Sequence, residues 1–461
     1  MKLETIYGPP GTGKTATLVG IAEAELAGNG RVTYMSYSKA AATEATARLA
    51  ENGNLRTSTI HSLAFQALQM TRQQVVDKPS LKRFGALVGI PFSGAEANTD
   101  EEQQEGDEYM AVVQYARNTM ITREDAYERQ GSPGQIDRFL MFASSYEEWK
   151  AKNGLLDFDD MIDLAPARGL PRLPVIILDE AQDCTPMQWK LIEALVKCGT
   201  QRMYVAGDDD QAIFEWNGAD PHGMVSFTDG HDGKVRVLEK SYRVPESVYL
   251  EACRLTDKIK TRVPKKFTHR GEHGNVHTFD SIEDVSSVHL SADGTDTMYL
   301  ARDRFQLNEI KLMLNHNNIP YSVNGGWSNW TNKYAKAIKA IAAANRGEKY
   351  DAAVIHFVAK PGVMGFGNGQ HWKKVIDVPP FLHNFYEAVD LDQPIHTRIS
   401  TIHQAKGKEA DTVIVDLKMS ARGERSIYTG DRARDAELRC WYVAFTRAKE
   451  NLLICGENPL V

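Results

Sequence analysis

Residues 8–15 read Gly8-Pro9-Pro10-Gly11-Thr12-Gly13-Lys14-Thr15 and fit the pattern G-x-x-x-x-G-K-[ST] at every fixed position. In such a loop the glycines let backbone N–H groups curl around phosphate oxygens, while Lys14 adds positive charge and Thr15 offers a hydroxyl to Mg²⁺. Residues 3–7 before the loop have the pattern of a short strand, and residues 15–27 after it have the spacing of a helix. A glycine-rich turn without a ligand would not need these flanks, so the sequence predicts a site for a nucleoside triphosphate.

The composition describes an ordinary globular chain. Its 461 residues are enough for about three domains with sizeable cores. The net charge of −7 does not indicate nucleic-acid binding, although a local basic groove can exist within a negative total. The five cysteines lack C-x-x-C spacing, so we expect neither zinc nor disulfides. No apolar run is long enough for a membrane span, and the N-terminus leads directly into the predicted strand. We therefore expect no signal peptide, no membrane partner and a cytoplasmic, intracellular protein, a description that includes a virus-encoded protein in a host cell.

A pair of carboxylates follows a second predicted strand. Residues 175–178 are all apolar, as in the buried strands of parallel sheets, and Asp179 and Glu180 come directly after them. Carboxylates at the carboxyl end of such a strand face the ligand crevice. Asp179 is placed to hold Mg²⁺, and Glu180 to orient or deprotonate the water that attacks a phosphoanhydride. Without the loop upstream these residues would be read as surface charge, but with it the catalytic interpretation is favoured.

A third polar segment carries two aromatic residues. Gln211 follows the predicted strand at residues 203–206, and Phe214 and Trp216 come three and five residues later. One short segment of this kind can touch a terminal phosphate at one end and stack on a base at the other. The rings are equally well explained as core residues, so the pattern leaves both interpretations open.

The stretch at residues 65–165 turns helical and polar, which predicts an inserted helical subdomain. Near its end lie Asp157, Asp159 and Asp160. A metal site is one interpretation of these aspartates, but a helix N-cap with first-turn charges is favoured.

The second half of the chain shows another α/β unit, beginning near residue 245. Residues 298–302 and 412–417 have strand patterns, and residues 437–449 are predicted as a helix before a last strand. Residues 327–394 have mixed character and are predicted as a small insertion. One basic cluster, which either tracks phosphates or forms a solvated face, comprises Lys258, Lys260, Arg262, Lys265, Lys266, His269 and Arg270.

Taken as an ordered set, these motifs resemble those of the UvrD/Rep-like helicases of superfamily 1, and the match covers nearly the whole chain. The matching segments are Gly8 to Thr15 (motif I), Tyr37 to Glu44 (Ia), Thr57 to Ser62 (Ib), Asp179 to Asp183 (II), Gly207 to Ala219 (III), Tyr242-Arg243 (IV), Thr401 to Glu409 (V) and Tyr442 to Lys449 (VI). The resemblance implies an α/β fold of two RecA-like P-loop NTPase domains with parallel sheets, each carrying an inserted subdomain. The implied boundaries are 1–64 and 166–244 for the first RecA-like domain, 65–165 for its helical insertion, 245–326 and 395–461 for the second RecA-like domain, and 327–394 for its small insertion.

The resemblance also implies roles for individual residues. Lys14, with the rest of the loop from Gly8 through Pro9, Pro10, Gly11, Thr12 and Gly13 to Thr15, would hold the phosphates, and Thr15 and Asp179 would hold Mg²⁺. Glu180 would act on the attacking water. Gln211, Arg243 and Arg447 would contact the γ-phosphate, the arginines stabilising transition-state charge. Tyr242 would stack on adenine and Glu409 would reach the ribose. The residues along single-stranded DNA would be Ser38, Thr59, His61, Phe214, Trp216, Thr401, His403 and Lys406.

The chain departs from the family pattern at several positions. Family members usually have a glutamine-containing segment that reads adenine before the loop, and no glutamine precedes Tyr7 here. We therefore expect weaker discrimination between ATP and other triphosphates. Asn217 and Ile60 replace the usual Arg and Phe, which predicts weaker DNA contacts, and Lys408 replaces a Leu. The second insertion is also much shorter than in large family members, so strand separation is expected to differ more than translocation.

The sequence thus predicts an ATP- and Mg²⁺-dependent helicase that moves 3′ to 5′ on single-stranded DNA and unwinds duplex in replication, recombination or repair. We expect a monomer acting on single strands and single-strand/duplex junctions, and a loading protein is left open. One alternative is a translocase that displaces proteins without unwinding. The other is a P-loop signalling or assembly ATPase that binds no nucleic acid.

Overall fold

The computed structural model describes residues 1–37, 49, 53–93, 104–286, 294–323, 333–363, 369–388 and 395–461. They form two compact units. Unit 1 comprises Met1–Tyr242 and Thr261–Thr268, and unit 2 comprises Arg243–Lys260 and His269–Val461. Each unit has a six-stranded sheet in which every pairing is parallel. The predicted α/β class with two parallel sheets is therefore confirmed.

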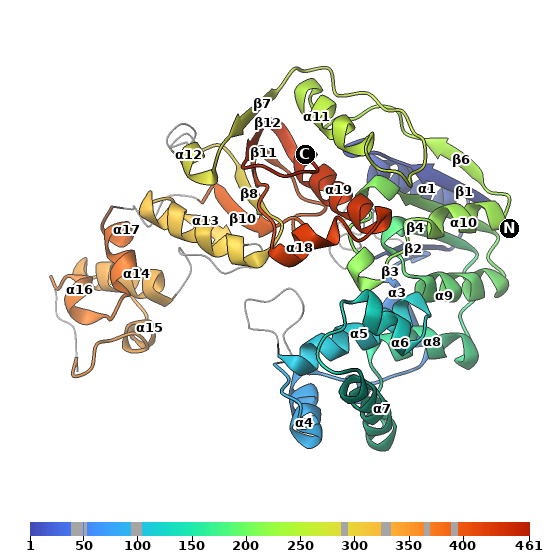
Figure 1. Ribbon diagram of the computed structural model, residues 1–461, viewed down its shortest axis with the longest axis horizontal. Helices are drawn as coiled ribbons and strands as arrows, with labels where there is room; N and C mark the ends of the chain where they lie inside the picture. Colours follow the sequence, from blue (N-terminus) through green and yellow to red (C-terminus); the bar gives the residue numbers. More distant parts are fainter. Residues whose placement is uncertain are drawn as a thin grey trace. The chain divides into compact units, whose positions relative to one another are not determined.

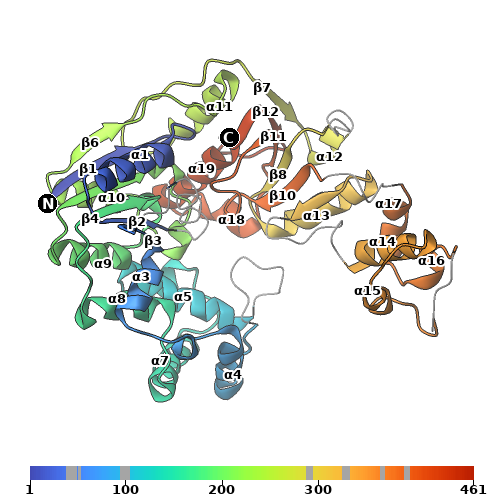
Figure 2. The same cartoon turned by 180° about the vertical axis from the view of Figure 1, so that it is seen from behind.

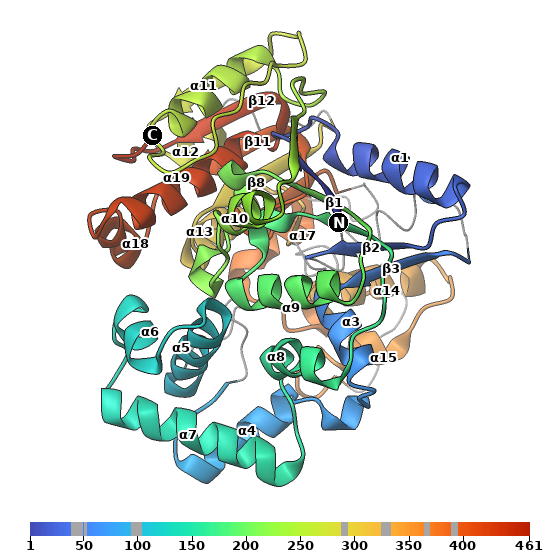
Figure 3. The same ribbon diagram turned by 90° about the vertical axis from the view of Figure 1, so that its right-hand side faces the viewer.

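The sheet of unit 1 has the strand order β3-β2-β4-β5-β1-β6. Its strands are β1 (Lys2–Tyr7), β2 (Val32–Ser36), β3 (Leu55–Thr59), β4 (Val175–Asp179), β5 (Arg202–Gly207) and β6 (Lys234–Val237). Helix α1 (Lys14–Ala27) covers one face, whereas α3 (Ile60–Ala67) and α9 (Pro186–Lys197) cover the other (Figure 3). Alternate residues of β4 enter these two cores, Val175 with the α1 side and Ile176 with the α9 side. Burial on both faces explains why this strand is apolar throughout.

The remaining helices of unit 1 include a group with its own core (Figure 1). The remaining helices of unit 1 are α4 (Lys78–Val88), α5 (Glu105–Thr119), α6 (Arg123–Arg129), α7 (Ile136–Asn153), α8 (Phe158–Arg168) and α10 (Gly223–Gly230), with short 3₁₀ turns η1 (Arg72–Gln74), η2 (Ala181–Asp183), η3 (Asp209–Gln211) and η4 (Glu215–Asn217). The group with its own core consists of α4, α5, α6 and α7. Aromatic side chains from α4 to α7 pack together, whereas α3 and α8 pack into the sheet core. The separate core supports an inserted helical subdomain, and its limits at 65 and 165 stay predictions.

The sheet of unit 2 has the order β7-β12-β11-β8-β10-β9. Its strands are β7 (Asn275–Phe279), β8 (Thr297–Ala301), β9 (Tyr321–Val323), β10 (Thr397–Thr401), β11 (Ala410–Asp416) and β12 (Ala448–Cys455), and its helices are α11 (Glu246–Thr256), α12 (Ile282–Ser286), α13 (Arg304–His316), α18 (Ala421–Ser426) and α19 (Asp431–Phe445). A group of short elements has its own core (Figure 2): α14 (Lys333–Asn345), α15 (Ala352–His356), α16 (Trp372–Val375), η5 (Pro380–Leu382) and α17 (His383–Ala388).

Two features differ from the sequence expectations. The helix predicted to reach Lys449 ends at Phe445, and β12 begins at Ala448, so Arg447 lies in a tight turn. Residues 261–268 were expected with the second domain but belong to unit 1, because Arg262 and Lys265 are ion-paired to aspartates there. Within the residues that the structure describes, no helix has both the length and the apolar character needed to cross a membrane.

Candidate functional site

The predicted phosphate loop connects β1 to α1. Gly11 and Gly13 have φ of 72° and 81°, a left-handed conformation that favours glycine. Gly13 is the N-cap of α1 and offers no side-chain hydrogen bond to the first turn, so backbone N–H groups there remain for an anion. The Lys14 ammonium donates to the Gly8 carbonyl at 2.6 Å, which folds its side chain back along the loop. The loop therefore has the shape and charge of a phosphate site.

Asp179, at the end of β4, lies beside the start of α1. Its carboxylate accepts hydrogen bonds from Thr15 Oγ1 at 3.2 Å, from Tyr34 Oη at 2.8 Å and from the Glu180 N–H at 2.9 Å. Burial, and after it the nearby Glu180 carboxylate, raise the pKa of Asp179 to about 6, although Tyr34 and Lys14 act in the opposite direction. The structure thus brings together the predicted Mg²⁺ residues Thr15 and Asp179. Sequence reasoning missed Tyr34, which gave no signal beyond its place in a strand.

Glu180 is connected to Gln211 through two side chains. Glu180 has φ of 55°, a left-handed conformation that is costly for a non-glycine residue and is typical of functional positions. The side-chain amide of Gln182 donates through Nε2 to the Glu180 carboxylate at 2.5 Å, and its oxygen Oε1 accepts the Asp208 N–H at 3.0 Å. Asp208 in turn accepts from Gln211 Nε2 at 2.7 Å. Gln182 and Asp208 therefore join two predicted catalytic residues, a link that no local pattern could reveal.

Tyr242 lies beside the loop. Its N–H donates to the Gly11 carbonyl at 2.8 Å, and the Ser241 hydroxyl donates to the Pro10 carbonyl at 2.8 Å. The Tyr242 side chain is 71% exposed. A ring held next to a phosphate loop and open to solvent is suited to stacking on a base.

The predicted DNA residues of unit 1 follow the carboxyl ends of β3 and β5. Phe214 stacks on Tyr37 with ring centroids 5.6 Å apart, and Trp216 lies 6.5 Å from Phe214 and is 40% exposed. Thr59 caps α3, and burial lowers the pKa of His61 to about 4. His61 is therefore neutral near pH 7 and offers no positive charge to a phosphate. Ser38 lies outside the described residues.

In unit 2, Arg243 forms an ion pair with Glu409, with Nε and Oε2 2.5 Å apart. Arg447 is 1% exposed, and its guanidinium donates to the Val443 carbonyl at 2.9 Å and to Thr446 at 3.2 Å. A further contact reaches the Lys408 carbonyl at 3.4 Å. Arg243, Arg447 and Glu409 therefore all belong to unit 2, whereas Gln211, which is also expected at the γ-phosphate, belongs to unit 1.

The last residue of β10 and the loop between β10 and β11 carry the predicted DNA residues of unit 2. Thr401 is 4% exposed and accepts the Gln404 N–H at 3.4 Å. His403 is also buried, with Nε2 3.8 Å from Cys440 Sγ. Lys406 is half-buried. The DNA roles of all three stay predictions.

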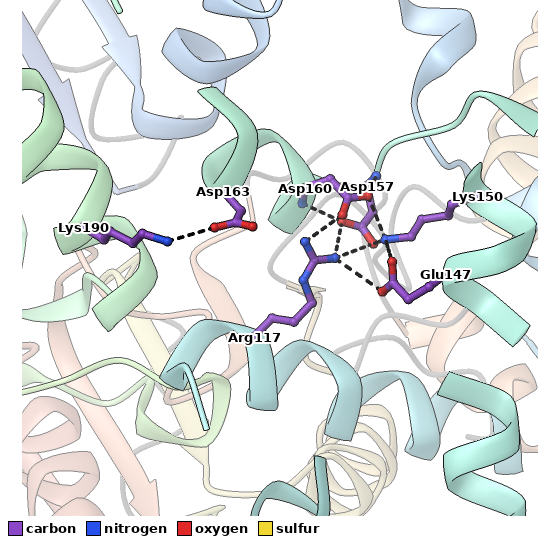
Figure 4. Close-up of polar contacts among 7 residues, drawn as sticks. All are labelled: Arg117, Glu147, Lys150, Asp157, Asp160, Asp163 and Lys190. Carbon is purple, nitrogen blue, oxygen red and sulfur yellow. Dashed lines mark hydrogen bonds and ion pairs between the residues drawn. The ribbon is translucent and has the colours of Figure 1, made fainter. Parts of the chain in front are cut away.

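Asp157 and Asp160, at the N-cap and in the first turn of α8, belong to a charged cluster within unit 1 (Figure 4). Asp157 caps α8 by accepting the Asp160 N–H at 2.8 Å, and Asp160 accepts the Asp157 N–H at 2.9 Å. Arg117 from α5 lies 2.7 Å from Asp160, and Lys150 from α7 lies 2.7 Å from both aspartates. The capping interpretation is confirmed, and two cations fill the space that a metal interpretation would require.

The sequence of the chain is similar to that of two known protein domains. Residues 4–232 match the UvrD/REP helicase N-terminal domain, and residues 382–458 match the UvrD-like helicase C-terminal domain, so the two matches together cover well over half of the chain. The chain belongs to the UvrD/Rep-like helicase family. Its two parallel sheets are accordingly those of the family's two RecA-like domains.

Relatives of this UvrD-like chain include the putative ATP-dependent DNA helicase YjcD of Bacillus subtilis (strain 168), which is 24% identical over 287 residues, or 57% of this chain and 37% of the relative. The ATP-dependent DNA helicase PcrA of Staphylococcus epidermidis is 24% identical over 292 residues, or 58% of this chain and 40% of the relative. PcrA of Staphylococcus aureus (strain NCTC 8325 / PS 47) is 23% identical over the same length. The UvrD-like chain thus spans about two fifths of the length of these relatives.

Proposed function

We propose that the protein is an ATP-driven DNA helicase that moves along single-stranded DNA in the 3′ to 5′ direction and separates duplex at single-strand/duplex junctions. The observation that carries the proposal is the continuous network from Glu180 through Gln182 and Asp208 to Gln211. The same segment continues within five residues to the exposed ring of Trp216. The network thus joins the proposed hydrolytic carboxylate to the segment that carries the proposed base-stacking ring, which would let ATP hydrolysis and DNA binding influence each other. The names of the relatives support ATP and DNA as the substrates.

Hydrolysis is assigned to residues around the loop. Lys14 and the loop N–H groups bind the phosphates, and Glu180 orients the attacking water. The oxygens of Thr15 and Asp179 are 3.2 Å apart and are ligands of the type that Mg²⁺ prefers, so these two residues fit the ion. Bound Mg²⁺ would neutralise charge that develops on the phosphates.

Arg243 and Arg447 are assigned to the γ-phosphate. The Arg243 guanidinium forms an ion pair with the Glu409 carboxylate. A phosphate has anionic oxygen acceptors of the same kind and can take the place of that carboxylate. We therefore expect Arg243 to exchange Glu409 for phosphate during turnover, which frees Glu409 for the ribose hydroxyls. Arg447 is held by carbonyl groups in a fixed orientation, as electrostatic stabilisation of a transition state requires.

DNA binding is assigned to residues at or after the carboxyl ends of β3 and β5 in unit 1 and of β10 in unit 2. Stacking of Phe214 on Tyr37 fixes one ring, and the exposed Trp216 offers a face to a base. The proposed track also includes Thr59, His61, Thr401, His403 and Lys406.

The protein is proposed to act as a monomer in replication, recombination or repair.

Steady-state hydrolysis of ATP with and without single-stranded DNA tests the proposal. Strong stimulation by DNA is expected, and a rate that DNA does not change would favour a signalling or assembly ATPase. Unwinding of 3′-tailed against 5′-tailed duplexes then tests polarity. Protein displacement without unwinding of either duplex would identify a translocase instead.

A further inference from the structure

Three consecutive aspartates in unit 1 surround a buried lysine. Lys265 Nζ lies 3.0 Å from Asp208, 2.5 Å from Asp209 and 2.7 Å from Asp210, and its side chain is 1% exposed. Arg262 binds Asp210 through two hydrogen bonds, of 2.8 and 2.5 Å. The basic cluster noted in the sequence therefore does not present these two cations to a DNA backbone. They face inward, toward the segment that carries Gln211.

The same three carboxylates have oxygens within 4.8 Å of one another, a spacing that would suit a metal ion. The Lys265 ammonium instead takes that place. Burial alone lowers the pKa of a lysine, but the attraction of the three carboxylates outweighs it and raises the pKa of Lys265, so its charge is permanent. A fixed organic cation therefore organises the cluster.

Lys265 contacts the catalytic network through Asp208. One carboxylate oxygen of Asp208 accepts from Lys265, and the other accepts from Gln211 at 2.7 Å. The Asp208 N–H donates to Gln182, which holds Glu180. Lys265 is thus one carboxylate away from Gln211. A buried ion pair is weak evidence for a role in stability, since apolar replacements of similar volume are often as stable.

The segment that carries these cations is anchored at both ends. Before it, Lys260 is bound in unit 2 to the first turns of α19, with its N–H 3.1 Å from Asp435 and its ammonium 2.7 Å from Asp431. At its far end, Thr268 accepts the Ser241 N–H at 2.8 Å, one residue before Tyr242. Within unit 1, residues 261–268 therefore join the segment that carries Gln211 to the Tyr242 region.

We propose that Lys265, supported by Arg262, is a positioning residue that fixes Gln211 and Glu180 for ATP hydrolysis by holding Asp208. The inference rests on the proposed function in that it assigns hydrolysis to these residues. It does not require that DNA is the partner.

The test compares variants of the full chain in the absence of DNA. Lys265→Met alone leaves buried carboxylates underneutralised and threatens the fold, so the principal variant is Lys265→Met with Asp209→Asn, which keeps the net charge of the cluster at −1. The matched control is Lys266→Met, the same change at the exposed neighbouring lysine. We expect the double variant to lower kcat by about 100-fold, as for a misplaced catalytic group, with KM for ATP changed by less than about threefold. The control should match the wild type.

The outcomes separate the inference from the proposed function. A folded double variant that keeps the wild-type kcat overturns the positioning role. So does a variant in which a higher KM for ATP accounts for the whole loss of kcat/KM, because that result reports weaker ATP binding rather than a misplaced catalytic group. A wild-type protein whose hydrolysis ignores single-stranded DNA overturns the helicase proposal, while the same variants still decide the role of Lys265. A wild-type protein without any hydrolysis overturns both.

Discussion

Replacing Gly8 with alanine tests whether the phosphate loop depends on the observed position of Lys14. A Cβ at residue 8 would lie 2.0 Å from Lys14 Cγ and 2.7 Å from Lys14 Cδ. These distances are far below van der Waals contact, so the Lys14 side chain must leave its place along the loop. Gly8 does not have a positive φ, and its backbone therefore tolerates alanine. The substitution acts on the lysine rather than on the fold.

The expected effect follows from the loss of the contact that we propose between Lys14 and a phosphate. A hydrogen bond to a charged group contributes about 1.5–3 kcal/mol, so Gly8→Ala should weaken ATP binding by about 10- to 150-fold. Titration of a fluorescent ATP analogue measures the change, and thermal unfolding reports on the fold.

Gly20→Ala is the matched control. Gly20 lies on α1, and among the described residues no atom beyond its own helix backbone and chain neighbours comes within 4 Å of the place that a Cβ would take. There, alanine should raise the free energy of unfolding by about 1 kcal/mol and leave ATP affinity unchanged. Equal ATP affinity of the Gly8→Ala and Gly20→Ala proteins would refute the reasoning, since it would show that Lys14 does not act from its observed position.

Three further results are expected. Lys14→Ala should abolish hydrolysis and leave the circular dichroism spectrum unchanged, because the hydrogen bond that its side chain donates ends on the loop carbonyl of Gly8. Asp179 has a native pKa of about 6, above its ordinary 3.8, so the free energy of unfolding falls as pH rises between these values. Asp179→Asn should therefore raise that free energy in Mg²⁺-free buffer by up to about 3 kcal/mol above pH 6, measured by urea unfolding, and abolish hydrolysis. Trp216→Ala should weaken single-stranded DNA binding by about 5- to 150-fold, measured by fluorescence anisotropy, because one base loses its stacking partner.

Each of these results has an outcome that contradicts it. Retained turnover in Lys14→Ala would overturn the site assignment. An Asp179→Asn protein that is less stable than the wild type at high pH, yet equal to it at low pH, would show that the carboxylate stabilises the fold when charged. For Trp216→Ala the control is Tyr428→Ala, which removes an aromatic side chain that is 78% exposed in unit 2. An equal loss of DNA affinity in both variants would argue against a specific stacking role.

Much of the local structure of the candidate nucleotide site was predictable because its determinants are local. The glycines with positive φ, the strand before the loop and the helix after it all lie within residues 2–27. The apolar strand β4, which ends at Asp179, was equally predictable from the sequence, because a strand that is buried on both faces is apolar at successive positions. Parallel pairing then places the carboxyl ends of both strands at one edge of the sheet.

Other features could not be predicted from local sequence patterns. Seven basic residues near residue 260 looked alike in the sequence, but Arg262 and Lys265 turn inward while Lys266 stays exposed. The helix that was expected to continue to Lys449 ends before Arg447, because β12 pairs with β11 from Ala448 onward.

By itself, the sequence determined that the chain forms a phosphate loop, two α/β units and a carboxylate pair, because residues close along the chain fix those structures through backbone conformation and hydrophobic periodicity. Only the tertiary structure decided which distant charges meet. Asp208 and Lys265 are far apart along the chain, and Arg243 and Glu409 are farther apart still. Pairs of this kind form because a buried charge must find an opposite partner once folding has removed water, and the partner is whichever residue the topology brings there.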